Sequence, residues 1–517
     1  MIFPKIKFNR EFLSVFLIIL LAAFLRLFRI SDYMTFLGDE GRDVLVAKGI
    51  LEGHFTLLGP RASAGDFFLG PIYYYFMAPF LWLFRLDPVG PAVMVALIGI
   101  ATVFLIYKVT KEFFSVKAAI IASSLYAVSP LVISYSRSSW NPNPIPFVSL
   151  LTLYLSYKAI ENPAWKKFVT IGILLGIGLQ LHYLATFLII IVGAFLFFSK
   201  FHKKFNLNEL LKKYVQIFAG FILGFSPFLA FESRHGFPNM KTIFNFISTN
   251  TFSASYGDNV SFINIVKDVF FRLFSRLITN FPTSDHFYNF LGQERLLFWW
   301  QTATVVLGIA SIFFIFGKKK KLTKIFFETW FFLGIFLFGF YKKPIYDYYF
   351  GFLFPLPFIL VGNFLSQVYE YKKFNYLPKI LSVAVFLSLF ILNLSYNPFR
   401  YEPNRQKEQV KKISEFVLSK TDNKPFNFAL ITAHNSDHAY RYYFDVLGKS
   451  DVRMENPTFD PQRKTVTDQL LVVCEDVECK PLGHPLFEVS NFGRAEIVGE
   501  WNVSVVKVFK LVHYKIK

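Results

Sequence analysis

The sequence predicts a mainly α-helical, polytopic membrane protein that ends in a small α/β domain. Hydrophobic residues make up 54% of the 517 residues and charged residues only 17%, a balance far from that of a soluble domain. Long apolar segments alternate with short Lys/Arg clusters up to about residue 397. The 68 phenylalanines suit helices that face lipid. We therefore expect a membrane module over 1–397 and a separate domain over 398–517.

The apolar segments predict about eleven membrane-spanning helices. The first follows Lys5, Lys7 and Arg10, and because no small-residue cleavage site comes after it, we expect a retained helix that starts in the cytoplasm. The expected spans are 11–30, 90–108, 118–135, 146–160, 168–181, 184–199, 215–231, 296–316, 325–341, 349–366 and 378–396.

The basic clusters predict the orientation of these spans. They lie between alternate pairs of spans, and the positive-inside rule places them in the cytoplasm. The opposite side then receives the loops 31–89, 136–145, 232–295 and 342–348, together with the C-terminal domain. We expect this side to be extracytoplasmic, at the plasma membrane of a prokaryote. The clusters are Lys108/Lys111/Lys117, Lys158/Lys166/Lys167, Lys200/Lys203/Lys204/Lys212/Lys213, Lys318 to Lys321 with Lys324, and Lys372/Lys373/Lys379.

Two segments need a specific interpretation. Residues 168–199 have basic clusters at both ends, so we expect a tight hairpin with its outer tip at 180–183 rather than one long helix. Residues 71–84 are short, aromatic and interrupted by Pro79, and a span there would invert every later basic cluster. We therefore expect an aromatic helix in the outer interface.

The C-terminal domain shows the pattern of a small α/β unit. A helix is expected over 404–420, a strand over 426–432, a helix over 436–447 and further strands through 469–510. Its only cysteines, Cys474 and Cys479, are the only two in the chain. An extracytoplasmic position permits a disulfide between them, and two reduced thiols are equally compatible with the sequence.

Adjacent carboxylates in the first outer loop form the strongest candidate site. Asp39 and Glu40 follow the first apolar segment closely, where charge near a membrane is costly and usually functional. A carboxylate beside apolar walls can act as a general base. The alternative is structural, because Asp39 can cap a helix over about 40–51. The loop also carries Arg42, Asp43, Arg61 and Asp66, which favours the functional interpretation.

Several cations, with Arg42 and Arg61 of this loop among them, are candidates for binding a phosphate. Arg26 and Arg29 end the first helix on the outer side, where snorkelling to lipid headgroups is the structural alternative. Lys342 and Lys343 are the basic pair that the topology places outside, and Arg137 lies in the second outer loop. Cations at this depth suit a phosphate leaving group. The net charge of +20 is explained by topology, and we expect no nucleic-acid partner.

The first loop resembles that of a known enzyme family. A first helix that ends in Arg, then Gly38-Asp39-Glu40, a short helix, and a Gly/Pro-rich stretch from Gly59-Pro60-Arg61 to Gly70-Pro71 is similar to the GT-C glycosyltransferases. Within them, it resembles the family-39 group with the protein O-mannosyltransferases and the lipid A aminoarabinose transferase. The resemblance implies a polyprenyl-phosphate sugar donor, transfer on the outer face with inversion, and catalysis by Asp39 with Glu40.

The chain departs from this family in the second outer loop. Relatives often carry an acid there, whereas this chain has the amides Asn141 and Asn143 in Tyr135-Ser136-Arg137-Ser138-Ser139-Trp140-Asn141-Pro142-Asn143. A metal bridging the two loops is therefore not predicted, although a divalent cation stays open as a cofactor. His182 stands at a tip where relatives often have a basic residue. The candidates for substrate binding are Asp43, Asp66, Asn141, His182, Tyr346 and Asp347.

The resulting prediction is a glycosyltransferase with Asp39 as general base and Glu40 orienting it. Its expected partners are membrane lipid, a polyprenyl-phosphate-linked sugar and a hydroxyl acceptor on protein, lipid or glycan. A transporter or flippase for lipid-linked sugars is the main alternative, but it predicts charges near the bilayer midplane. A polysaccharide ligase or polymerase, or a non-catalytic scaffold, are further alternatives. In the C-terminal domain, His434 and His438 have helical metal-ligand spacing, but Asn435 to Asp437 favour helix capping there.

Overall fold

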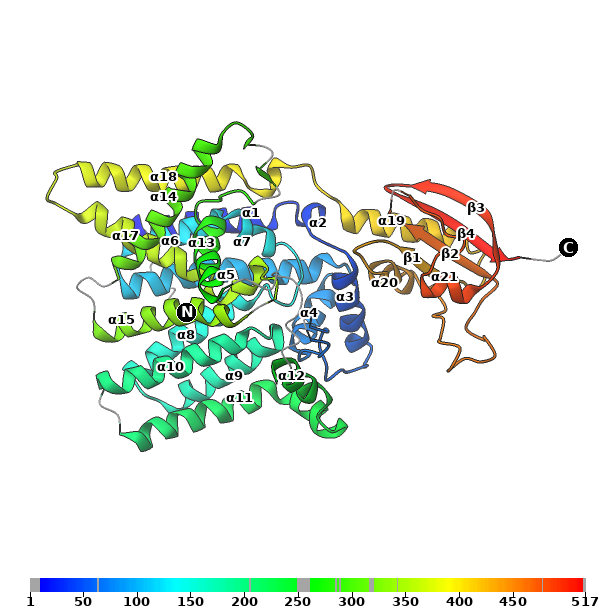
Figure 1. Cartoon of the computed structure of the whole chain (residues 1–517), viewed down its shortest axis with the longest axis horizontal. Coiled ribbons are helices and arrows are strands. Elements are labelled where there is room, and N and C mark those ends of the chain that lie inside the picture. Colours follow the sequence, from blue (N-terminus) through cyan, green and yellow to red (C-terminus); the bar gives the residue numbers. More distant parts are fainter. Residues whose placement is uncertain are drawn as a thin grey trace, which may run out of the picture.

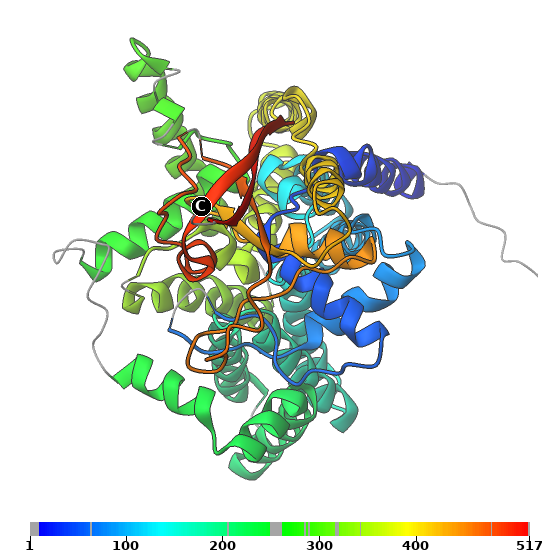
Figure 2. The ribbon, with the colours of Figure 1, turned by 90° about the vertical axis from the view of Figure 1, so that its right-hand side faces the viewer.

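The computed structural model describes residues 10–62, 65–203, 206–248, 261–283, 286–287, 290–315, 320–341, 343–476 and 478–514. Figure 1 shows a bundle of roughly aligned helices with the C-terminal domain attached at one end. Seen from that end, the domain lies over the helix termini (Figure 2). The two parts therefore meet at the end of the bundle to which the sequence assigns the outer loops.

The first outer loop folds into helices that lie across this end. The chain leaves helix α1 (Arg10–Leu27), makes the short α2 (Ile30–Tyr33), and then forms α3 (Gly38–Leu51) and α4 (Ile72–Leu83) before α5 (Val89–Phe113). In Figure 1, α3 and α4 run crosswise to the bundle, and α3 faces the C-terminal domain. The segment that was expected to lie in the membrane interface is thus helix α4, whose axis runs across the bundle and not along it.

Within the described residues, each segment that was expected to span the membrane is mostly helical, with breaks in 118–135 at Ser129 and in 349–366 at Phe354. By length and composition alone, α5, α11 (Leu207–His235), α14 (Glu294–Phe313), the continuous run Lys321–Phe340 and α18 (Leu377–Ser395) are long and apolar enough to cross it. A further span would be formed by Asp347–Leu353 and α17 (Pro355–Glu370), which meet at 59°. The count of eleven stays a prediction. The remaining helices are α6 (Val116–Val128), α7 (Pro130–Tyr135), α8 (Ile145–Glu161), α9 (Trp165–Leu181), α10 (Ala185–Lys203), α12 (Pro238–Ser248), α13 (Phe262–Leu277), α15 (Lys321–Glu328) and α16 (Gly334–Phe336).

The hairpin expected over 168–199 is present. Helix α9 ends at Leu181, His182 adopts an extended backbone, and α10 begins at Ala185. Helix α9 also packs directly on α11: a Cβ on Gly172 would lie 2.0 Å from the Ile217 carbonyl oxygen, and one on Gly220 would lie 2.0 Å from that of Val169. Small residues allow such backbone contact between membrane helices.

One polar side chain at the end of α9 holds the outer loop in place. Gln180 is fully buried, its Nε2 donates to the Gly224 carbonyl, and its Oε1 accepts the Ile72 N–H at 3.2 Å. These bonds tie the start of α4 to both α9 and α11. A buried amide satisfied on both sides fixes the register of the elements that it joins.

The C-terminal domain is a four-stranded sheet with three helices. Its elements are α19 (Gln406–Ser419), β1 (Asn427–Ile431), α20 (His438–Val446), β2 (Gln469–Cys474), α21 (Phe487–Phe492), β3 (Ala495–Val503) and β4 (Val506–His513). The strand order is β1-β2-β4-β3, with β1 parallel to β2 and the other pairs antiparallel. The predicted α/β unit is confirmed within these residues, and Cys474 and Cys479 form a disulfide.

This domain is docked on the membrane module. Side chains of α19 and α20, among them Val410 and Tyr442, belong to the same hydrophobic core as the first outer loop. Two ion pairs cross the interface, Lys407 with Asp87 at 2.8 Å and Lys48 with Asp445 at 2.8 Å. The interface therefore combines apolar burial with fixed charges, and it lies around α3.

Candidate active site

The two adjacent carboxylates occupy the first turn of α3 but have different surroundings. The Asp39 side chain is 57% exposed, whereas Glu40 is buried. Leu37 is the residue that precedes the helix, and Glu40 accepts the Leu37 N–H at 3.0 Å. Glu40 therefore caps the start of α3, and the alternative prediction that Asp39 is the capping residue is wrong. Burial raises the pKa of the Glu40 carboxyl to about 7.

Arg42 links Asp39 to a third carboxylate. Its Nη1 donates to Asp39 Oδ1 at 2.9 Å, while its Nε and Nη2 donate to Asp43 Oδ1 at 2.9 and 2.8 Å. Asp43 is fully buried, and this burial raises the pKa of its carboxyl to about 6 even though the Arg42 charge opposes the rise. These bonds use three of the five N–H donors of the guanidinium.

Asp39 faces a polar cavity of about 530 Å³ between the membrane module and the C-terminal domain. Trp140 and Tyr135 supply aromatic surface, and hydroxyl and amide side chains supply hydrogen-bonding groups. The cavity is lined by Thr35, Leu37, Gly38, Asp39, Glu40, Ser134, Tyr135, Ser138, Trp140, Asn143, His434, Asn435 and Ser436. The chemistry of this lining suits a sugar or another polyhydroxylated group beside a carboxylate.

A second cavity, of about 160 Å³, shares Asp39 and Trp140 with the first and gathers the predicted residues most closely. Asn141 and His182 reach it from two other loops, and the Asn141 amide donates to the Leu181 carbonyl at 2.6 Å. Burial lowers the pKa of His182 to about 3, so this ring is neutral. Its predicted residues are Asp39, Arg42, Arg61, Asn141 and His182, with Tyr183 and Tyr348 beside them.

A third cavity continues from the second. It measures about 380 Å³, is lined almost entirely by apolar side chains, and shares Leu69 and Tyr183 with the second cavity. Phe67 and Phe68 come from the first outer loop, while Phe187, Phe225, Phe228 and Phe340 come from α10, α11 and the helical end of the Lys321–Phe340 run. A polar, a cationic and an apolar compartment thus follow one another, with Asp39 between the first two.

Three predicted phosphate ligands do not line these cavities. Arg26 is fully buried and donates to the carbonyls of Ala22, Ala127 and Tyr126. Arg137 donates to the carbonyls of Leu25 and Phe28, and Arg29 pairs with Asp32 at 2.8 Å. Because Arg26 and Arg137 satisfy helix-end carbonyls that water cannot reach, they stabilise the packing of α1 and are not proposed as phosphate ligands.

The predicted residues of the later outer loop are also used differently. Asp347 binds Arg276 Nε at 3.0 Å and both Nε and Nη2 of Arg272, with distances of 3.1 and 2.5 Å. Tyr346 is 54% exposed, and Lys343 is half-buried. Neither side chain lines the three cavities. Asp66 pairs with Arg61 at 2.7 Å on the surface. Lys342 lies outside the described residues.

Several residues of the site were not predicted. Trp140 and Tyr348 pack at 4.4 Å between ring centroids and line the second cavity. Both lie in loops that the sequence analysis singled out. They were not named as candidates, because aromatic residues are frequent throughout the membrane module. Arg272 and Arg276, which bind Asp347 outside the three cavities, were not predicted either, although they lie four apart in the amphipathic helix α13. Asn435 and Ser436 come from the C-terminal domain, and no local pattern connects them with Asp39.

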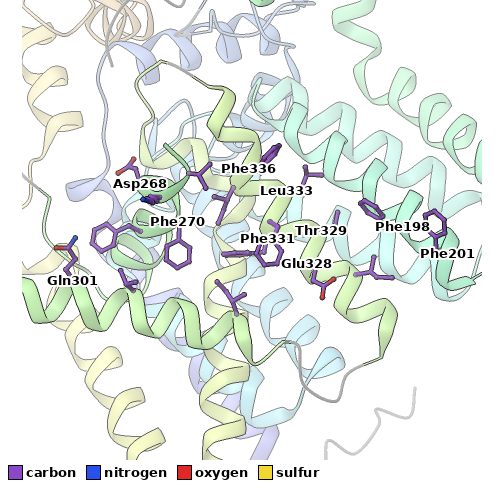
Figure 3. A pocket seen from close by; sticks show the side chains of 18 residues that line it. Phe198, Phe201, Asp268, Phe270, Gln301, Glu328, Thr329, Phe331, Leu333 and Phe336 are labelled. Atoms are coloured by element: carbon purple, nitrogen blue, oxygen red, sulfur yellow. The ribbon is translucent and has the colours of Figure 1, made fainter. Parts of the chain in front are cut away.

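A larger cavity of about 1270 Å³ lies apart from Asp39, between α10, α13, α14 and the Lys321–Phe340 run (Figure 3). Phenylalanines dominate its wall, and Lys267, Asp268 and Glu328 stand among its few charged residues. A groove of this composition on membrane helices is suited to hydrocarbon chains of the bilayer. It contains none of the predicted site residues and is not assigned to the chemistry.

No group of three or more His, Cys, Asp or Glu side chains in the part of the chain that the structure describes could hold a metal ion. His438 donates to or accepts from Ser436 Oγ at 2.8 Å, and His434 lines the polar cavity. The described residues therefore supply no ligand set to which the divalent cation left open by the sequence can be assigned.

Comparison with known proteins identifies the fold. Residues 69–231 match the family model described as dolichyl-phosphate-mannose-protein mannosyltransferase, which is less than half of the chain. ArnT from Cupriavidus metallidurans bound to undecaprenyl phosphate superimposes with a TM-score of 0.62 at 12% identity, covering 96% of this chain and 97% of that one. The chain has the GT-C glycosyltransferase fold.

Two further GT-C structures give the same result. AglB, the archaeal oligosaccharyltransferase from Archaeoglobus fulgidus, in complex with an inhibitory peptide and a dolichol-phosphate, has a TM-score of 0.55 at 14% identity and covers 91% of this chain and 70% of that one. The arabinofuranosyltransferase AftD from Mycobacteria has a TM-score of 0.52 at 11% identity, with 99% of this chain and 40% of that one covered. No curated protein sequence matches the chain. The predicted resemblance to the GT-C group is confirmed, and the chain is a multi-pass membrane protein of that fold.

Proposed function

We propose that this protein is a membrane glycosyltransferase that moves a sugar from a polyprenyl-phosphate donor to a hydroxyl acceptor on the outer face of the membrane, with inversion. The observation that carries the proposal is the succession of cavities around Asp39: polar, cationic, then apolar. This order matches the order of groups in the complex of donor and acceptor. The ArnT and AglB structures hold undecaprenyl phosphate and dolichol-phosphate respectively, which supports a lipid-phosphate donor here.

The donor is placed by the chemistry of its parts. Its isoprenoid chain is assigned to the apolar cavity between Phe187 and Phe228, where burial of hydrocarbon is favourable. Its phosphate is assigned to the small cavity with Arg42 and Arg61, since guanidinium groups bind phosphate oxygens well. The sugar then extends past Asp39 into the polar cavity, where it meets the acceptor.

The transfer step is an in-line displacement at the sugar carbon. The acceptor oxygen forms a bond to that carbon while its proton passes to the Asp39 carboxylate. The bond from the carbon to the phosphate oxygen breaks, and its electron pair leaves with the polyprenyl phosphate. Arg42 and Arg61 neutralise the charge that develops there, and the proton on Asp39 is later released to water. Glu40 holds the backbone at the start of α3, and Asp43 orients Arg42.

The position of the charged groups favours an enzyme over a transporter. Asp39 and Arg42 lie in α3, which crosses the end of the bundle and faces the C-terminal domain (Figure 1), and Arg61 lines the same small cavity. A transporter would use charges deeper in the bundle, near the middle of its helices. The clustered residues at the end of the bundle suit a reaction at the membrane surface.

The test uses the full chain in lipid nanodiscs with a panel of polyprenyl-phosphate sugars. We expect one donor to be hydrolysed or transferred, and Asp39→Asn to lower kcat by about 10²- to 10⁴-fold with little change in undecaprenyl phosphate binding. Asp422→Asn is the matched control, because Asp422 is exposed, pairs with Lys510 within the C-terminal domain and lines none of the three cavities. Wild-type turnover in Asp39→Asn would remove Asp39 as the base, and wild-type protein that turns over no donor of the panel would contradict the proposed activity.

A further inference from the structure

The loop before α20 lies directly on the first turn of α3. The Gly38 N–H, one residue before Asp39, donates to Asn435 Oδ1 at 2.9 Å. The same oxygen accepts the Ser436 N–H at 2.8 Å. Backbone donors in the first turn of a helix have no partner within the helix. Here the C-terminal domain supplies the partner, at the residue next to the proposed base.

Asn435 is itself held by a carboxylate. Its Nδ2 donates to the two Glu475 oxygens at 3.0 and 3.1 Å, and the Tyr440 hydroxyl donates to Glu475 Oε1 at 2.8 Å. Glu475 directly follows β2, and its N–H donates to the Ile431 carbonyl at 3.0 Å. The carboxylate therefore fixes the amide with its nitrogen toward Glu475 and its oxygen toward Gly38.

The glycine at position 38 is explained by this contact. A Cβ there would lie 1.9 Å from Ser436 Oγ and 2.8 Å from the Ser436 backbone nitrogen. Any side chain would push the loop away and lengthen the hydrogen bond to Asn435. The backbone of α3 and the loop thus touch without intervening side chains, and a displacement of one is passed to the other.

We propose that Asn435, oriented by Glu475, is a positioning residue for Asp39, and that the C-terminal domain is in this way part of the catalytic centre. The inference rests on the proposed function, because it assigns Asp39 as the base. The contact fixes the backbone at Gly38. Because Asp39 is the next residue, its carboxylate keeps its position relative to the phosphate site only while that backbone is fixed. Reaction rates respond strongly to shifts of this kind.

The experiment compares Asn435→Ala with wild-type full-length protein in nanodiscs. Hydrogen exchange of the amides of residues 38–40 is expected to become faster. With the donor that the wild type turns over, kcat is expected to fall by about tenfold to a hundredfold, while KM for that donor and binding of undecaprenyl phosphate stay within about twofold. A structural defect that spread through the donor site would raise KM and weaken undecaprenyl phosphate binding as well.

Variants of Glu475 test the relay. Glu475→Gln keeps an oxygen that accepts from Asn435 and is expected to retain near wild-type kcat, whereas Glu475→Ala is expected to behave like Asn435→Ala. Asn427→Ala is the matched control for lost stability of the domain, since Asn427 bonds to Val452 and Thr465 within the domain and away from α3. It is expected to lower the unfolding temperature without the selective loss of kcat.

The outcomes separate this inference from the proposed function. Wild-type kcat and exchange in Asn435→Ala, or an equal kcat loss in Asn427→Ala, would overturn the positioning role. If the positioning role is overturned while Asp39→Asn is inactive in the same assay, Asp39 remains the proposed base. Full activity in Asp39→Asn would contradict the base and, with it, any positioning of that base.

Discussion

Replacing Gly41 by alanine is expected to separate the C-terminal domain from α3. A Cβ at this position would lie 2.3 Å from the backbone nitrogen of Ala439, 2.4 Å from its Cα and 2.7 Å from the His438 carbonyl carbon. All three are backbone atoms of α20, so no side-chain rotation relieves the overlap. Because non-bonded atoms settle near 3.5 Å, α3 and α20 must move apart by about 1 Å.

The cost follows from the packing that this movement disturbs. Overpacking of a tight interface costs about 1–3 kcal/mol, and weakening the bond from Gly38 to Asn435 adds about 0.5–1.5 kcal/mol. The helix propensity of alanine returns less than about 1 kcal/mol. We therefore expect Gly41→Ala to destabilise the docked state by about 0.5–4.5 kcal/mol, with a lower kcat because the first turn of α3 loses its anchor.

Gly49→Ala on the same helix is the matched control. The nearest atom to a Cβ there is His54 Cβ at 3.7 Å, an ordinary contact, so alanine is expected to be neutral or to stabilise α3 by up to about 1 kcal/mol. The assay is thermal unfolding in nanodiscs together with limited proteolysis of the C-terminal domain and the transfer rate. Equal unfolding temperatures, proteolysis and kcat for the two alanine variants would refute the docking argument.

Two other outcomes are expected. The pKa of Glu40, raised from 4.5 to about 7 by burial, means that the folded protein keeps a proton which the unfolded chain releases. Its contribution to stability is complete below about pH 4.5 and is lost as the pH rises through 7. Glu40→Gln should therefore flatten the fall in unfolding temperature with pH over this window. An unchanged slope of unfolding temperature against pH would contradict the buried, protonated carboxyl. Thr186→Trp at the apolar cavity should raise KM for a long-chain donor several-fold. Ile190→Trp, one turn further along α10 at an exposed position, should leave KM unchanged. Equal KM values for the two variants would argue against the isoprenoid site.

The sequence predicted the architecture well because its signals were physical constraints of the membrane. Apolar length and basic clusters placed the helices, and the hairpin break at His182 followed from the charges at both ends. The acidic pair was also found from the sequence, because charge beside an apolar segment is costly. Arg42, Arg61, Asn141 and His182 come together around Asp39 as candidates named from the sequence.

The roles of individual polar residues depended on tertiary contacts. The sequence analysis predicted Asp39 as the base with Glu40 orienting it, and the structure adds that Asp39 is exposed whereas Glu40 is buried at the start of α3. Arg26 had the position of a lipid-phosphate ligand, yet it satisfies buried carbonyls of α1 and of the helix beside it. Sequence position cannot decide between these roles, because both need a cation at a helix end.

By itself, the sequence determined that the chain forms membrane helices with an α/β domain after them and an acidic pair soon after the first helix. Tertiary structure alone decided that Asn435 meets Gly38, and that the glycines flanking the acidic pair serve as a contact for a domain about 400 residues further along the chain. The physical reason is the distance along the chain over which each kind of signal acts. Hydropathy and charge act within a segment and against the bilayer, whereas a backbone contact between distant segments exists only after both have folded.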